Sequence, residues 1–153
     1  MSAPAPLFTI GYEQVSSSSV LETLSGAGVD LLVDVRAVAA SRRAGFSKTL
    51  LAAGVSNIGI GYLHLRGLGT PAEGRQAART GHFGELRRIY GAHLETPTAR
   101  AQMDELAALV AAGRRVCLLC YERHPEHCHR QMIADIICER VGVPVEHLAA
   151  APL

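Results

Sequence analysis

The chain has few aromatic side chains and no excess of charge of either sign. Tryptophan is absent, and Phe and Tyr together make up 5% of the 153 residues, so there is little surface on which single-stranded nucleic acid could stack its bases. The formal net charge is +1, which gives no overall field to attract nucleic acid or an anionic membrane. Any attraction for phosphate must therefore come from a local group of basic residues.

The sequence also lacks long apolar runs. No stretch approaches the roughly 20 apolar residues that a membrane-spanning helix needs, and residues 1–6 contain neither a cationic stretch nor a long apolar core. We therefore expect no signal or anchor there, no membrane partner and a cytoplasmic location. The length, with 48% hydrophobic and 19% charged residues, is typical of a single globular domain over residues 1–153.

Two phosphate-binding motifs are missing. The glycine pairs at 59–61 and 67–69 lack the continuation of a dinucleotide-binding or Walker loop. A phosphatase loop needs a cysteine followed by five residues and an arginine, whereas Cys120 lies ten residues before Arg130 and Cys128 only two. The sequence gives no support for ATP chemistry and indicates no cofactor.

Residues 116–130 are the most informative segment, because they hold three of the four cysteines and three of the seven histidines. The segment begins as an apolar run typical of a buried strand, breaks at His124-Pro125 and continues as a helix with apolar residues at helical spacing. In an open α/β fold, the end of such a strand and the start of the next helix form the crevice where ligands bind. The residues predicted to line it are Cys120, Glu122, Cys128, His129 and Arg130.

The rest of the chain alternates between strand and helix patterns. Strands are predicted at 7–11, 29–35, 58–65, 114–120 and 145–148, and helices at 16–24, 48–53, 83–94, 98–112 and 127–141. Residues 72–82 carry few apolar side chains beyond alanine and are predicted to form a surface loop or lid. The alternation favours a three-layer, Rossmann-like α/β fold, with a mostly parallel sheet of about five strands and helices on both faces.

The cysteines have several interpretations. Cys117-x2-Cys120 followed by Cys128 and His129 suggests zinc, but positions three apart in a strand point to opposite faces, so the sequence predicts no metal site and places Cys117 in the core. Cys120 and Cys128 are expected at the crevice, where a helix N-terminus lowers the pKa of a thiol. They could provide a nucleophile, form a reversible disulfide, or simply pack the junction as small buried residues.

Other candidates follow the earlier strands. Asp34 and Arg36 alternate, so they share a face, where the arginine either binds a planar anion or forms a structural ion pair. Arg42, Arg43 and Lys48 belong to a basic loop that either binds phosphate or is solvated. Arg75 either closes over a bound anion or is solvated.

The remaining candidates are Tyr62, His64 and Glu13. Tyr62 and His64 alternate along the third strand and are expected on one face, with His64 as a general base, a phosphate donor or merely a hydrogen-bonded side chain. Glu13 follows the first strand and is a candidate acid in the same crevice.

These segments together resemble the domain-of-unknown-function family 488. The matching pieces span nearly the whole chain in order: Thr9–Glu13, Leu32–Arg36, Ser41-Arg42 with Gly45–Lys48, Tyr62–Leu65, Leu68-Gly69, and Leu118–Glu122 with Cys128–Arg130. The resemblance implies an α/β fold with a polar site built from the strand ends. It implies no particular reaction.

The leading hypothesis is a small enzyme acting on a phosphate-bearing ligand, such as a nucleotide or a nucleic-acid base or end. In this hypothesis arginines hold the anion, a carboxylate does the acid–base work, and Cys120 or Cys128 is the nucleophile or redox switch. The arginines are Arg36, Arg42 and Arg130, and the carboxylates are Glu122 and Asp34. The alternatives are a non-catalytic nucleic-acid-binding or redox-sensing module and a purely structural ion-pair network.

Overall fold

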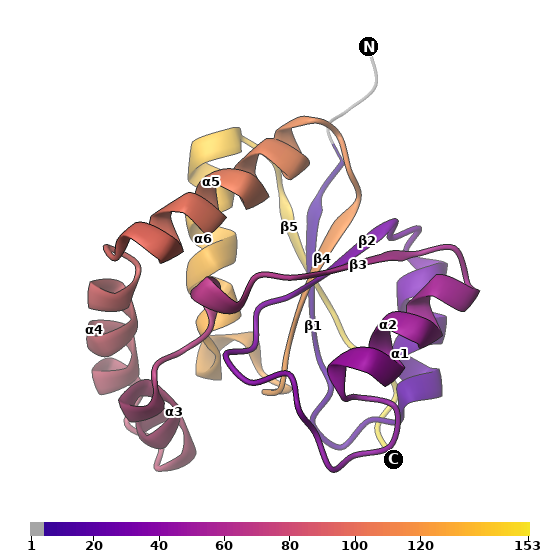
Figure 1. Ribbon diagram of the computed structural model, residues 1–153, viewed down its shortest axis with the longest axis horizontal. Helices are drawn as coiled ribbons and strands as arrows, with labels where there is room; N and C mark the ends of the chain where they lie inside the picture. Colours follow the sequence, from indigo (N-terminus) through magenta and orange to yellow (C-terminus); the bar gives the residue numbers. More distant parts are fainter. Residues whose placement is uncertain (1–4) are drawn as a thin grey trace.

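The computed structural model describes residues 5–153, and all five strands of its sheet run parallel (Figure 1). The strand order is β3-β2-β4-β1-β5. Residues 1–4, which belong to the segment predicted to carry no signal, lie outside the described residues. The strands are β1 (Leu7–Gly11), β2 (Leu31–Asp34), β3 (Gly61–His64), β4 (Val116–Cys120) and β5 (Val145–Leu148).

Helices cover both faces of this sheet, which confirms the predicted three-layer α/β architecture (Figure 1). Helices α1 (Ser17–Gly26) and α2 (Lys48–Asn57) cover one face, and α5 (Pro97–Ala111) and α6 (His129–Val141) cover the other. Helices α3 (Ala72–Arg79) and α4 (Phe83–His93) pack against each other beside α6. Two short 3-10 turns are η1 (Arg66–Leu68) and η2 (Pro125–His127). Within residues 5–153, no helix combines the length and apolar character needed to cross a bilayer.

The central strands are apolar along their whole length because both of their faces are covered. Every residue of β1, β2 and β4 is buried, as expected for a parallel sheet between two helical layers. Successive side chains of β4 alternate between the layers: Cys117 packs in the core under α1 and α2, whereas Cys120 packs in the core under α5 and α6. The predicted opposite orientation of these two thiols is confirmed.

The segment 72–82 contradicts its prediction, because most of it forms α3 rather than a loop. Its alanine, arginine, glutamine and glutamate residues are good helix formers, and the helix packs through small side chains instead of large apolar ones. Gly74 and Ala77 are its buried positions, and a Cβ on Gly74 would lie 2.3 Å from Cγ2 of Thr70. An alanine-rich helix of this kind gives little apolar periodicity, which explains the wrong prediction.

The connections create a crevice between the carboxyl ends of β2 and β4. From β2 the chain passes through α2 to β3 on one face of the sheet, whereas from β4 it passes through α6 to β5 on the other face. Neighbouring parallel strands whose connections diverge in this way leave an opening at their carboxyl ends, which is the usual ligand site of open α/β sheets. The segments at this opening are Asp34–Arg36 and Cys120–Glu122.

Candidate functional site

A cavity of about 250 Å³ lies at this crevice. Residues that follow β2 and β4 form one side of it, the start of α6 forms another, and α3 with α4 supplies the remaining wall. The lining residues are Tyr12, Arg36, Val38, Thr70, Arg75, Ala78, Arg79, Leu86, Cys120, Tyr121, Glu122, His127, Cys128 and His129. The cavity therefore unites residues far apart in the sequence, as predicted for the end of β4 and the start of α6.

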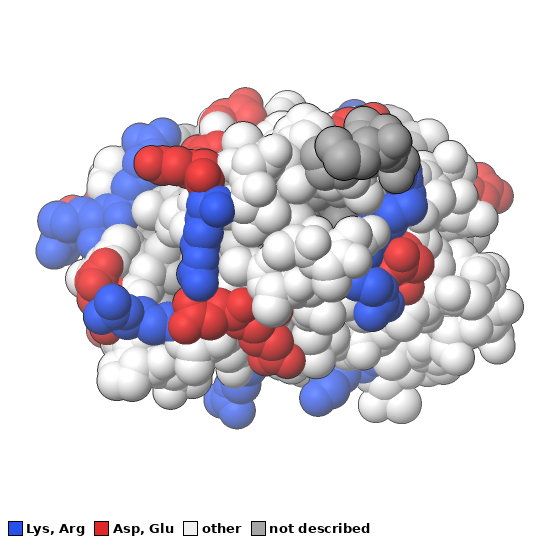
Figure 2. Space-filling view, turned by 90° about the horizontal axis from the view of Figure 1, so that it is seen from above, with Lys and Arg blue, Asp and Glu red and all other residues white. Residues whose placement is uncertain are grey.

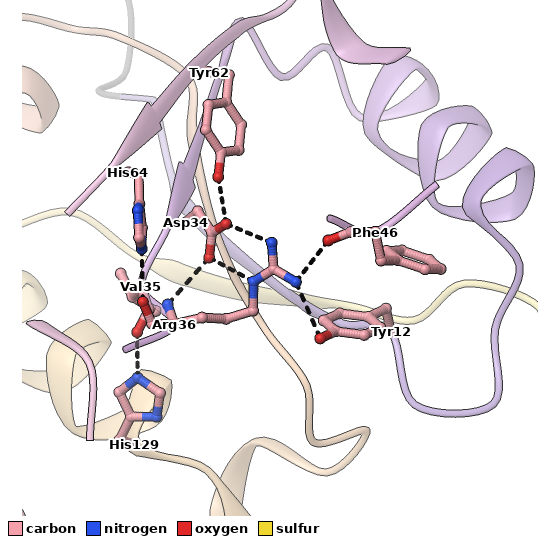
Figure 3. A network of polar contacts seen from close by, with 8 residues as sticks. All are labelled: Tyr12, Asp34, Val35, Arg36, Phe46, Tyr62, His64 and His129. Carbon is pink, nitrogen blue, oxygen red and sulfur yellow. Dashed lines mark hydrogen bonds and ion pairs between the residues drawn. The ribbon is translucent and has the colours of Figure 1, made fainter. Parts of the chain in front are cut away.

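Cys120, Cys128 and His129 form a buried cluster in the wall of this cavity, here called the thiol–imidazole cluster. Cys120 is the last residue of β4, and Cys128 is the N-cap residue of α6. Each sulfur lies 3.6 Å from Nδ1 of His129, and Nε2 of His129 donates a hydrogen bond of 2.7 Å to the carbonyl of Val35 (Figure 3). The side chains of the cluster are close enough together to share a metal ion.

The cluster favours one ionised thiol. Burial opposes ionisation of Cys128, but a hydrogen bond from Cys120 and the adjacent His129 outweigh it, and the pKa of Cys128 lies well below its ordinary value. The hydrogen bond to the Cys128 thiolate, together with burial, raises the pKa of Cys120 well above its ordinary value. Burial would lower the pKa of His129, yet the Cys128 thiolate raises it. The three shifts together favour a thiolate at Cys128 and keep the protons on Cys120 and His129.

Glu122 supplies a carboxyl group with a raised pKa. Burial raises its pKa to about 7, and the Cys128 thiolate and the Glu13 carboxylate act in the same direction. Glu13 accepts a hydrogen bond of 3.0 Å from the backbone N–H of Arg123, so it lies beside this segment without lining the cavity. A carboxyl group with this pKa can both donate and accept a proton.

Asp34 and Arg36 form a fully hydrogen-bonded network at the end of β2, here called the strand-end brace (Figure 3). The Asp34 carboxylate accepts bonds of 2.9 and 2.7 Å from Nε and Nη2 of Arg36 and a further bond from the Tyr62 hydroxyl. Nη1 of Arg36 donates to the Tyr12 hydroxyl and, at 2.7 Å, to the carbonyl of Phe46. Each guanidinium nitrogen already has an acceptor, which favours the structural ion-pair interpretation of Arg36.

Tyr62 and His64 both contact the strand-end brace. Tyr62 reaches the Asp34 carboxylate, and Nε2 of His64 lies 2.7 Å from the carbonyl oxygen of Arg36, as a donor to it. Neither residue lines the cavity. The alternation along β3 therefore delivers both side chains to the brace rather than to the cavity.

Arg130 is completely buried and holds the segment after β4 in place. Its Nε donates to the hydroxyl of Thr9 at 3.2 Å, and its two terminal nitrogens donate to the carbonyls of Glu122 and Arg123. The close approach requires glycine at position 11, because a Cβ there would lie 1.8 Å from the carbonyl oxygen of Glu122. The Arg130 guanidinium thus holds the backbone of Glu122 in place and does not line the cavity.

The basic residues of the loop before α2 do not form the predicted phosphate site at the cavity. Arg42 and Lys48 are exposed and do not line the cavity. Arg43, from the same predicted basic loop, instead donates a 2.6 Å bond to the carbonyl of Tyr12 and lies over the Phe46 ring at 5.1 Å. No sequence signal distinguishes Arg43 from Arg42, because loop residues have no periodicity that fixes their direction.

Two of the three arginines that line the cavity lie on α3, and the third is Arg36 of the strand-end brace. Arg75 and Arg79 are four residues apart, so they share one face of the helix, and both line the cavity. Arg75 donates through Nη1 to the carbonyl of Thr70 at 2.8 Å, and Arg79 donates through Nη2 to Gln76 at 2.8 Å. Arg79 was missed because the segment was predicted as a loop, where the spacing of four has no meaning.

Comparisons with known proteins agree with the resemblance seen in the sequence. No match is found among curated proteins or among solved structures. The model of the family described as "Domain of unknown function DUF488" matches residues 16–137, a range that contains the strand-end brace, the arginines of α3 and the thiol–imidazole cluster. The chain therefore belongs to the DUF488 family.

Proposed function

We propose that the protein is an enzyme that acts on a small phosphate-bearing ligand bound in the cavity between α3 and the ends of β2 and β4. The observation that carries this proposal is that one cavity is lined by Arg75 and Arg79 in addition to Arg36, by a protonatable carboxyl group, and by two thiols with the imidazole of His129. Groups that bind an anion and groups that transfer protons or attack an electrophile thus converge on one space, which is the pattern of an active site.

Arg75 and Arg79 are the residues proposed to bind the phosphate. A guanidinium binds phosphate through parallel N–H groups, and Arg75 and Arg79 each use one terminal nitrogen on a protein acceptor among the described residues. Arg36 and Arg130 use all three of their nitrogens on protein acceptors. The anion-binding role proposed from the sequence for Arg36, Arg42 and Arg130 is therefore better assigned to the α3 arginines.

The size of the cavity favours a small ligand. Its volume of about 250 Å³ lies just below the roughly 300–1,000 Å³ typical of small-molecule sites. A space of this size suits a phosphorylated small molecule or one nucleotide unit. In the proposed reaction the ligand's reacting group lies against the thiol–imidazole cluster, and Glu122 transfers the proton.

The alternative is a regulatory module without turnover. The closeness of the Cys120 and Cys128 thiols favours a redox-sensing version of it. A nucleic-acid-binding version needs a continuous positive surface, whereas on the face in Figure 2 lysines and arginines are interspersed with aspartates and glutamates. The converging arginines and the carboxyl group of Glu122 have no role in a redox sensor, so the enzyme remains the better-supported function.

The proposal is tested by measuring thermal stability with inorganic phosphate, mononucleotides, sugar phosphates and short oligonucleotides. A ligand that binds the folded protein raises the midpoint, and we expect a small phosphate compound to do so. The double variant Arg75→Ala/Arg79→Ala should lose this shift. Arg42→Ala, which removes an exposed arginine outside the cavity, is the matched control and should keep it.

Two results would contradict the proposal. One is a shift with oligonucleotides alone that disappears with added salt. The other is an equal loss of the shift in the Arg42→Ala control and in the α3 double variant, because binding would then depend on general surface charge.

A further inference from the structure

The thiol–imidazole cluster has the composition of a zinc site. We propose that Cys120, Cys128 and His129 bind one Zn²⁺ ion and leave its fourth coordination position open to the cavity. Two thiolates and one imidazole are among the ligand sets of catalytic zinc, which keeps one position for water or substrate. Among the described residues, these side chains form the group of three or more His, Cys, Asp and Glu ligands close enough for a metal ion.

The distances within the cluster match those around zinc. With Zn–S of about 2.3 Å, Zn–N of about 2.0 Å and tetrahedral angles, a sulfur and a nitrogen ligand lie roughly 3.5 Å apart. In the structure Nδ1 of His129 is 3.6 Å from the sulfur of Cys120 and 3.6 Å from that of Cys128. One imidazole nitrogen can form an in-line hydrogen bond with only one of the two sulfurs, whereas an ion between them would contact all three atoms.

The imidazole of His129 is held in the orientation that a metal ligand requires. Its Nε2–H donates to the carbonyl of Val35 at 2.7 Å (Figure 3), so the lone pair of the neutral ring is on Nδ1, the nitrogen that faces the sulfurs. Metal-ligating histidines commonly donate their other N–H to a backbone carbonyl or carboxylate, which fixes the tautomer. The accepting carbonyl belongs to Val35, which directly follows β2 and lies across the crevice from α6.

Burial and charge also suit the ion. The ligand residues are buried, where unpaired thiolates are costly, and two thiolates balance the charge of Zn²⁺. Zinc binds thiolates and a neutral imidazole, so its binding releases the protons that these ligand atoms carry. Cys120 also lies 4.0 Å from Nε2 of His129, so its sulfur must turn towards the Nδ1 side when the ion enters.

The prediction that no metal is bound came from a four-residue ligand set that included Cys117. The side chain of Cys117 does point to the other face of the sheet. The other three residues of that set, Cys120, Cys128 and His129, nevertheless lie together without it. The inference therefore departs from the sequence-based expectation by using three protein ligands instead of four.

The open position gives the ion a role in the cavity. Zinc can polarise a phosphoryl or carbonyl oxygen or lower the pKa of a bound water, and Glu122 lines the same cavity as a proton acceptor for such a water. This catalytic role rests on the function proposed above, whereas the binding of zinc does not.

The test is metal titration of the reduced, metal-free protein under argon. We expect one Co²⁺ per chain, seen as thiolate-to-cobalt charge-transfer absorption, and its displacement by one Zn²⁺. In wild type, Zn²⁺ should also protect Cys120 and Cys128 from alkylation, as mapped by peptide mass spectrometry, and leave Cys138 reactive. These wild-type readouts do not depend on the folding of any variant.

Variants make the assignment specific. Cys128→Ser should weaken metal binding by more than about 100-fold, since loss of an outer-shell partner alone costs roughly 10–100-fold, while the matched Cys138→Ser should bind as wild type does. Reduced wild-type protein that takes up no stoichiometric metal, or metal binding that persists in Cys128→Ser, would overturn the inference. Metal binding by a protein whose phosphate response ignores Arg75 and Arg79 would overturn the proposed function alone.

Discussion

The strand-end brace and the thiol–imidazole cluster occupy the same edge of the sheet, yet they differ in how far their polar groups are satisfied. In the brace, Asp34 and Arg36 are joined by two short hydrogen bonds, and each nitrogen of Arg36 has an acceptor. In the cluster, soft sulfur atoms lie 3.6 Å from one imidazole nitrogen and line a cavity. A charged residue at a strand end is therefore available to a ligand only when its own partners leave donors or lone pairs unused.

The largest expected effect is a loss of stability when the strand-end brace is broken. Asp34→Asn removes the charge that pairs with the buried Arg36 and disturbs the acceptor of the Tyr62 hydroxyl. Breaking a buried ion pair costs about 3–5 kcal/mol, so the free energy of unfolding, measured by urea denaturation, should fall by about that amount.

The matched control for Asp34→Asn is Asp30→Asn. Asp30 pairs with Arg114, and both side chains are more than two-fifths exposed, so this change should cost less than about 1 kcal/mol. Equal losses from the two variants would mean that the brace contributes no more than a surface pair.

The second prediction concerns the cluster side of the comparison. Glu122→Gln keeps the size of the side chain but removes its proton transfer, so turnover of the ligand identified by the stability screen should fall by roughly 10²–10⁴, with ligand binding largely retained. Steady-state kinetics together with calorimetric binding separates the two effects. Glu13→Gln, which changes a neighbouring carboxyl group outside the cavity, serves as the control and should reduce turnover far less.

This prediction would be contradicted if Glu122→Gln lowered the free energy of unfolding as much as Asp34→Asn does. Glu122 would then be a structural residue like those of the strand-end brace.

The smallest expected effect concerns Gly11, which packs against the backbone of Glu122 next to the cluster. Gly11→Ala places a methyl group against the carbonyl of Glu122, and such overpacking typically costs 1–3 kcal/mol. Gly91→Ala in α4, where nothing lies within 4 Å of the added Cβ, should instead stabilise the protein by roughly 0.5–1 kcal/mol. Thermal or chemical denaturation of both variants gives the comparison, and two changes of the same sign would show that the close contact at Gly11 is easily relieved.

The sequence predicted the fold and the part of the crevice formed by the end of β4 and the start of α6, because continuous apolar runs mark buried parallel strands and the alternation within β4 separates Cys117 from Cys120. It did not predict which arginines are available. Arg130 finds the hydroxyl of Thr9, 121 residues earlier in the chain, and such partners exist only after folding. The α3 arginine Arg79 was missed for a local reason, since an alanine-rich helix lacks the apolar periodicity that marks a helix in sequence.

Helices α3 and α4 form a hairpin that stands to one side of the sheet (Figure 1) and contributes Arg75 and Arg79 to the cavity. The cysteines and Glu122 belong to other parts of the chain, at the end of β4 and the start of α6. In the proposed function, ligand selection and bond chemistry are therefore encoded in separate stretches of sequence. If that function holds, exchange of residues 72–93 by mutation or design would redirect the protein to a different phosphorylated compound and leave the sheet and its reactive groups unchanged.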